Sequence, residues 1–143
     1  MDISARRARN AALINILLEI FFMFFGLTTF LIAKFVENKK VGEIFNYVSL
    51  GLFVLWIVFF IILLTRTRDF KFLFWQRVTY ILGFVLLISF SVLVVIFYKK
   101  IPENVLEWIP LIGLIVSWLF YLITISVLIV MRTKIKKTFS QTV

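Results

Sequence analysis

Glu19 is the one ionisable side chain that lies well inside a long apolar segment of this 143-residue chain. It stands eight residues, or about 12 Å along a helix, from the polar flank of that segment. A carboxylate at this depth of a bilayer is unfavourable by about 2.5–3.5 kcal/mol and usually faces a bundle interior or a water-filled cavity. No Lys or Arg lies at this depth, where the other apolar segments carry Trp56, Ser89 and Thr124. We therefore expect Glu19 to be protonated and hydrogen-bonded, and the chemistry open to it is proton binding and release.

Enzymatic chemistry would need side chains that this sequence lacks. The chain contains no histidine and no cysteine, so the commonest general base, the commonest metal ligand and the thiolate nucleophile are missing. The remaining acidic residues are scattered over connecting segments, and no glycine-rich phosphate loop occurs. The sequence predicts a protein that is not an enzyme, with no catalytic residue, no metal site and no cofactor.

Small and polar residues form a stripe along the segment that carries Glu19. Their spacings alternate between four and three, which places them on one face of a helix. Small residues permit close helix approach, and polar ones hydrogen-bond across the contact. We expect this face to point into the protein, with Asn15, Glu19, Gly26 and Thr29 as its polar and packing site. The whole stripe comprises Ala8, Ala12, Asn15, Glu19, Phe22, Gly26, Thr29 and Ala33.

The elements that must position this stripe are membrane-spanning helices. Hydrophobic residues make up 63% of the chain, against about 45–50% in soluble proteins. Four apolar runs reach the roughly 20 residues that cross a bilayer, and they do not alternate in polarity as barrel strands do. The sequence predicts an all-α integral membrane protein, a single four-helix bundle over residues 1–143. Its helices are expected at about residues 11–33, 44–64, 78–98 and 109–131.

The basic residues indicate how these helices are oriented. They occur in short clusters between the apolar runs rather than in one stripe, so the net charge of +9 favours a topology signal over nucleic-acid binding. Eleven of the sixteen lie in the amino-terminal arm, the loop between the second and third helices, and the tail. The acidic residues Glu37, Glu43, Glu103 and Glu107 lie on the other side. These patterns predict a multi-pass protein of the cell membrane with both termini cytoplasmic.

The middle loop combines cations with aromatic rings. Aromatic residues typically lie at headgroup level, while cations beside them reach water, which favours simple anchoring at the interface. The alternative is that the same cations bind anionic lipid headgroups. The aromatic residues are Phe70, Phe72, Phe74 and Trp75, and the candidate headgroup contacts are Arg66, Arg68, Lys71 and Arg77.

Two stretches of the chain resemble each other in order and spacing. The sequence KKVGE at residues 39–43 recurs as KKIPE at 99–103, and GLFVLW at 51–56 recurs as GLIVSW at 113–118. This pattern suggests two duplicated helical hairpins that enter the membrane in the same direction, related by an axis along its normal. The alternative is chance similarity between segments rich in Val, Leu, Ile and Phe.

Three classes of function fit these features. Short loops, the absence of catalytic side chains and a polar stripe favour an accessory or assembly subunit of a larger membrane complex. Its partners would be membrane lipids and another membrane protein, or further copies of the same chain. The main alternative is a small homo-oligomeric transporter or proton-coupled exporter that uses Glu19, for which we expect a cavity only if two copies pair. A third class is a membrane regulator that binds anionic lipids.

Overall fold

The computed structural model describes residues 3–35 and 39–140, which are helical with no strand among them, whereas Glu37 lies outside the described residues. The elements in chain order are α1 (Ile3–Phe35), α2 (Lys39–Arg66), the 3-10 turn η1 (Lys71–Leu73), α3 (Phe74–Phe97), the 3-10 turn η2 (Tyr98–Lys100), the short α4 (Glu103–Leu106) and α5 (Ile109–Ser140). Within the described residues, α1, α2, α3 and α5 are long and apolar enough to cross a membrane. This confirms the prediction of four spanning helices, and such a set is typical of a multi-pass membrane protein.

The helices extend further than the apolar runs that predicted them. α1 begins at Ile3 rather than near residue 11, and α5 continues to Ser140 rather than ending near residue 131. Arg and Lys are good helix formers, so a basic flank does not end a helix. Both extensions are also held by packing, because Ala5 and Ala8 of α1 and Ile135 of α5 are fully buried in the same core cluster.

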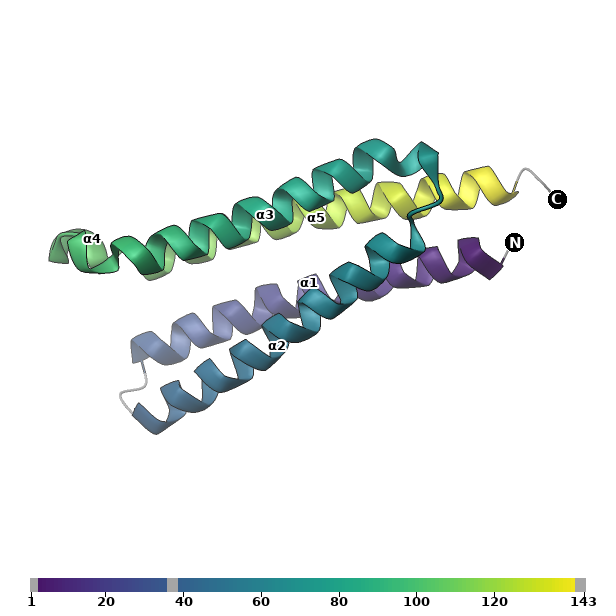
Figure 1. Ribbon diagram of the computed structural model, residues 1–143. Coiled ribbons are helices and arrows are strands. Elements are labelled where there is room, and N and C mark those ends of the chain that lie inside the picture. Colours follow the sequence, from purple (N-terminus) through teal and green to yellow (C-terminus); the bar gives the residue numbers. More distant parts are fainter. Residues whose placement is uncertain (1–2, 36–38, 141–143) are drawn as a thin grey trace.

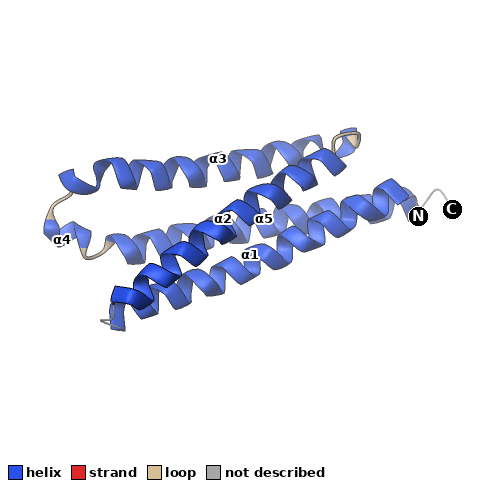
Figure 2. Cartoon of the chain, turned by 60° about the horizontal axis from the view of Figure 1, so that its bottom comes forward, coloured by secondary structure: helices blue, strands red, loops and turns tan. Residues whose placement is uncertain are grey.

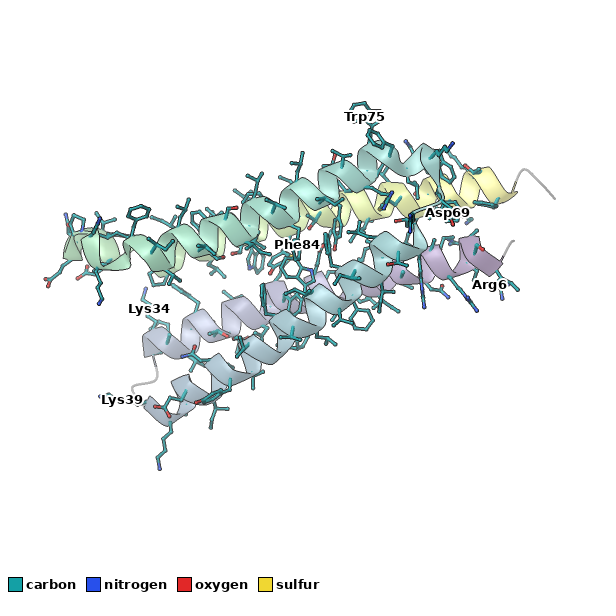
Figure 3. The ribbon with its side chains drawn as sticks, viewed as in Figure 1. Arg6, Lys34, Lys39, Asp69, Trp75 and Phe84 are labelled. Carbon is teal, nitrogen blue, oxygen red and sulfur yellow. The ribbon has the colours of Figure 1, made fainter. Side chains whose placement is uncertain are left out.

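The four long helices form two antiparallel hairpins. α1 packs against α2 and α5, and α3 packs against α5. α2 and α3 meet through aromatic side chains, of which Phe60 and Phe84 are stacked with ring centroids 4.0 Å apart and Trp56 lies 4.7 Å from Phe84. Figure 3 shows Phe84 directed into the space between the hairpins. The bundle is therefore joined by close helix contact on one side and by rings on the other.

The two ends of the bundle are packed differently. We call the end with both termini and the α2–η1 connection the inner end, and the opposite end the outer end. The hairpins lie close together at the inner end and separate toward the outer end (Figures 1 and 2). Nearly all of the core belongs to the inner half, including Ala12, Leu63, Leu73, Leu128 and Met131. The structure is thus closed at the inner end.

Charged side chains lie at both ends of the bundle. Lys34 and Lys39 lie at the outer end, and Arg6 and Asp69 lie at the inner end (Figure 3). The three basic clusters that predict the cytoplasmic side therefore share one end of the molecule.

The aromatic residues of the middle loop do not act as one group. Phe70 and Phe72 pack against Phe139 of α5, with ring centroids 5.5 and 6.4 Å away, and so help to bury the loop. Phe74 and Trp75 are exposed, and Trp75 projects away from the bundle (Figure 3). Phe70 and Phe72 thus have a packing partner in the extended end of α5, and anchoring of the four rings at the interface stays a prediction.

Candidate functional site

Glu19 lies midway along α1, and its side chain is completely buried. The Thr124 hydroxyl of α5 donates to Glu19 Oε2 at 2.9 Å, and the Tyr80 hydroxyl of α3 donates to Glu19 Oε1 at 3.2 Å. A buried carboxyl is tolerated only when hydrogen bonds replace its hydration. Glu19 therefore connects three helices, and its partners are hydroxyl groups.

Asn15, one helical turn nearer the inner end, belongs to the same buried network. Its amide nitrogen donates to the Phe59 carbonyl of α2 at 3.2 Å and to the Ala11 carbonyl at 2.9 Å. Its Oδ1 is 3.2 Å from the Tyr80 hydroxyl, which can donate there instead of to Glu19. Asn15 and Glu19 together tie α1 to all three other long helices.

Three aromatic rings cover the carboxyl from the outer side. Phe22, Trp56 and Tyr121 come from α1, α2 and α5, and their ring centroids are 6.0–6.4 Å apart in each pair. Trp56 is only 4% exposed, and its buried Nε1 lies near the Glu19 carboxyl and the Tyr80 hydroxyl, although it makes no hydrogen bond of ordinary geometry within the described part of the chain. The indole N–H therefore belongs to the polar surroundings of Glu19. We call Phe22, Trp56 and Tyr121 the ring cluster.

A cavity opens above the ring cluster toward the outer end. Its largest part, of about 710 Å³, lies between the outer halves of α1 and α5, and parts of about 270 and 220 Å³ extend toward α2 and α3. All three parts share Tyr121, so they meet at the ring cluster. The volume is in the range of small-molecule sites, about 300–1,000 Å³. The expectation that one copy would have little room for a cavity is wrong, because the hairpins separate.

The predicted stripe of α1 has two parts in the structure. Ala8, Ala12, Asn15 and Glu19 are buried between the helices, whereas Phe22, Gly26, Thr29 and Ala33 line the cavity. The Thr29 hydroxyl donates to the Phe25 carbonyl of its own helix at 2.9 Å. The opposite wall includes Gly113, Ser117 and Trp118 of α5, and the Trp118 Nε1 donates to the Met23 carbonyl of α1 at 3.1 Å.

Trp56, Ser89 and Thr124 stand at the depth of Glu19 in the sequence, and two of these three residues lie close to it in the structure. Thr124 binds the carboxyl and Trp56 belongs to the ring cluster, but Ser89 is exposed on α3. Its place is taken by Tyr80, nine residues nearer the inner end, which the depth of the apolar runs did not predict. A useful signal was that Tyr80 is a lone tyrosine in the inner half of its apolar run, where a buried hydroxyl requires a partner.

Gly83 allows α3 to come close to this site. A Cβ added at Gly83 would lie 3.1 Å from Thr124 Cγ2, tighter than ordinary packing. The absence of a side chain thus leaves room for the threonine whose hydroxyl reaches Glu19. Among the described residues, no group of three or more acidic, histidine or cysteine side chains could hold a metal ion.

The cations of the middle loop differ in their surroundings. The Arg77 Nη2 donates to the Leu64 carbonyl at 3.2 Å and so satisfies a carbonyl near the end of α2. Arg66, Arg68 and Lys71 are exposed. Headgroup contact by these four residues stays a prediction, and Arg77 has a structural role in addition.

Replacing Tyr80 by phenylalanine should lower the free energy of unfolding by about 1–2 kcal/mol, because one hydroxyl serves two buried acceptors. Unfolding in mild detergent measures this change. The matched control is Tyr47→Phe, which removes a hydroxyl from a side chain that is 77% exposed. Equal stability of the Tyr80 and Tyr47 variants would contradict a network in which Tyr80 is essential.

No protein-family model matches this chain, and no curated protein and no solved structure matches it either. The cavity, the ring cluster and Glu19 are therefore the features of this chain that bear on its function.

Proposed function

We propose that this chain is a small membrane transporter that exchanges protons for an apolar, positively charged solute at Glu19. The observation that carries the proposal is a cavity of about 710 Å³ that ends at Phe22 and Tyr121, two rings of the cluster that covers a buried carboxyl. Buried carboxyls of this kind are found in proton relays and substrate pathways. Short loops and the lack of catalytic side chains favour a subunit of a larger complex. The cavity and the buried carboxyl favour transport, which we therefore propose first.

Hydrogen-bond accounting supports a proton on Glu19. The Thr124 hydroxyl has one proton but three acceptors in reach, namely Glu19 Oε2 and the carbonyls of Phe120 and Tyr121, both at 3.0 Å. The Tyr80 hydroxyl likewise serves both Glu19 and Asn15. A protonated carboxyl adds the missing donor, since Glu19 then donates to Thr124 while Thr124 donates to a backbone carbonyl. The site thus suits the neutral form while no cation is present.

The lining of the cavity supports a cationic solute. Aromatic faces attract cations, and the attraction strengthens where water is excluded. Phe22 and Tyr121 of the ring cluster line the cavity, and the carboxyl behind them supplies the counter-charge once it loses its proton. Because one carboxyl can hold a proton or a cation but not both, the two species would move in opposite directions.

Both termini belong on the cytoplasmic side of a cell membrane in this proposal, so the cavity opens to the outside. The support is the shared inner end of the three basic clusters. Alternating access would then require the hairpins to close above Glu19 and separate below it. The proposed duplication suits this motion, because Trp56 and Trp118 hold equivalent positions in the two hairpins and both contact α1.

This orientation predicts a labelling pattern, which the absence of cysteine makes simple to measure. In intact cells, a maleimide that cannot cross the membrane should react with Lys39→Cys and should react with Asp69→Cys only after lysis. Both positions are exposed and lie at opposite ends of the bundle (Figure 3). Labelling of Asp69→Cys in intact cells would reverse the proposed direction of the cavity.

Transport itself is tested with the purified chain in lipid vesicles. An imposed pH gradient should drive the aromatic cation ethidium across the membrane against the proton flow, and an imposed ethidium gradient should move protons. Vesicles without protein give the background rate. Failure of both directions of coupling, with the protein folded and inserted, would overturn the proposal.

A subunit of a larger membrane complex is the second candidate. It is favoured by the lateral position of the smaller cavity parts, where Phe53 of α2 faces Val92 of α3 across a hollow that another helix could fill. In that case the tagged chain, expressed near its native level and extracted in mild detergent, should consistently bring down one larger membrane protein. Recovery of the chain alone, together with proton-driven exchange, would decide for transport.

A further inference from the structure

We infer that Arg9, Arg132 and Lys136 form a binding site for the phosphate of an anionic lipid, between α1 and α5 at the inner end. This site is separate from the cavity and from the loop cations that the sequence singles out. Its pocket has a volume of about 130 Å³ and is lined by these three residues together with Ile129 and Thr133. The volume equals that of about four water molecules in the liquid, which suits a phosphate group.

The fold places these three cations together although Arg9 is far from the other two in sequence. Arg132 and Lys136 are four residues apart and share a face of α5, where like charges repel, and Arg9 joins them from α1. An anion bound among them would turn this repulsion into attraction. Arginine is well suited to the role, because its planar guanidinium donates two parallel hydrogen bonds to phosphate oxygens.

Burial supports the assignment at Arg132. Its Nε is buried, yet it donates no hydrogen bond to any group that the structure describes. Such a donor usually has a partner. The Thr133 hydroxyl at the rim is already engaged, because it donates to the Ile129 carbonyl at 2.9 Å. The unmet hydrogen-bonding capacity at this site thus belongs to a cation, which indicates an anionic ligand.

Depth and charge balance identify the source of the phosphate. Arg9 stands just before the predicted hydrocarbon segment of residues 11–33, and Arg132 just after that of residues 109–131. This is the level of lipid headgroups, and anionic lipids attract basic side chains there. On the inner side the structure describes a single acidic residue outside the spans, Asp69, which lies on the middle loop, while Asp2 is outside the described residues. Membrane lipid supplies negative charge at this level.

The test compares two variants of equal net charge. Arg132→Gln with Lys136→Gln removes two cations from the pocket, and Arg6→Gln with Lys134→Gln removes two exposed cations elsewhere at the inner end. Thermal unfolding is measured in mild detergent with added phosphatidylglycerol, phosphatidylcholine or inorganic phosphate. We expect phosphatidylglycerol to raise the Tm of the unaltered chain and of the control pair by roughly 5 °C, and the pocket pair to lose that shift.

Three outcomes would overturn the inference. The first is a full shift in the pocket pair, and the second is an equal loss in both pairs, which would mean diffuse attraction by net charge. The third is an equal shift with inorganic phosphate and none with the lipid, which would assign the pocket to a free anion. Lys136→Gln alone, at an exposed position, serves where the pair does not fold, and it should reduce the shift by about half.

Discussion

Replacing Glu19 by glutamine is expected to reduce proton-driven ethidium exchange to the rate of protein-free vesicles, while the chain remains folded. Glutamine has nearly the same shape, its amide oxygen can accept from Tyr80, and its NH₂ group can donate to Thr124. Stability should therefore change by less than about 1 kcal/mol. The amide cannot bind or release a proton, so the coupling between proton and solute is lost entirely.

The control for this substitution is Glu43→Gln, which removes an exposed carboxyl from the outer end of α2. It should exchange ethidium at the unaltered rate. The measurements are dye movement under an imposed pH gradient and proton movement under an imposed dye gradient. Full coupling in the Glu19 variant would exclude the carboxyl from the mechanism and leave it as a packing contact.

The number and class of the helices follow from properties that the sequence contains directly. Each spanning run is apolar over its whole length, so lipid is the only suitable surroundings and α-helix the only suitable backbone. The inward face of α1 also follows, because the three-and-four spacing of Ala12, Asn15 and Glu19 fixes one side of a helix whatever surrounds it. These predictions depend on one segment at a time.

Features that depend on two segments were predicted less well. Depth counted from predicted helix ends selected Ser89, because that count assumes that all helices begin level with one another. α3 begins at Phe74 instead of residue 78, and the long side chain of Tyr80 then reaches Glu19 from below. The pocket of Arg9 with Arg132 required the same kind of knowledge, since it arises only when α1 lies beside α5.

The sequence could not predict the cavity, for a related reason. Its existence depends on the angle between the two hairpins, and the apolar pattern of a spanning helix is the same whether lipid, a ring or an empty space faces it. Phe53 and Phe60 illustrate this, because both are aromatic residues of α2. Phe53 borders the cavity, and Phe60 is stacked on Phe84 in the closed half.

Filling the cavity from Gly113 is expected to stop exchange as completely as the loss of the carboxyl, and by a different physical cause. Gly113 lines the wall on α5, and a Cβ there would meet nothing within 4 Å, so Gly113→Phe can place its ring in the cavity without displacing the backbone. The ring would occupy the solute path between the outer opening and Tyr121. Thermal unfolding should therefore be nearly unchanged while ethidium exchange falls to background.

Gly51→Phe is the matched control, because Gly51 is the counterpart of Gly113 in the repeat, also meets nothing within 4 Å, and is exposed on α2. Both substitutions replace a helical glycine by the same ring, so effects of helix propensity cancel between them. Exchange at the unaltered rate in the Gly113 variant would show that the solute does not pass through the cavity. If a partner helix occupies this space instead, Gly113→Phe should reduce recovery of that partner and Gly51→Phe should not, so one pair of variants separates the two proposed functions.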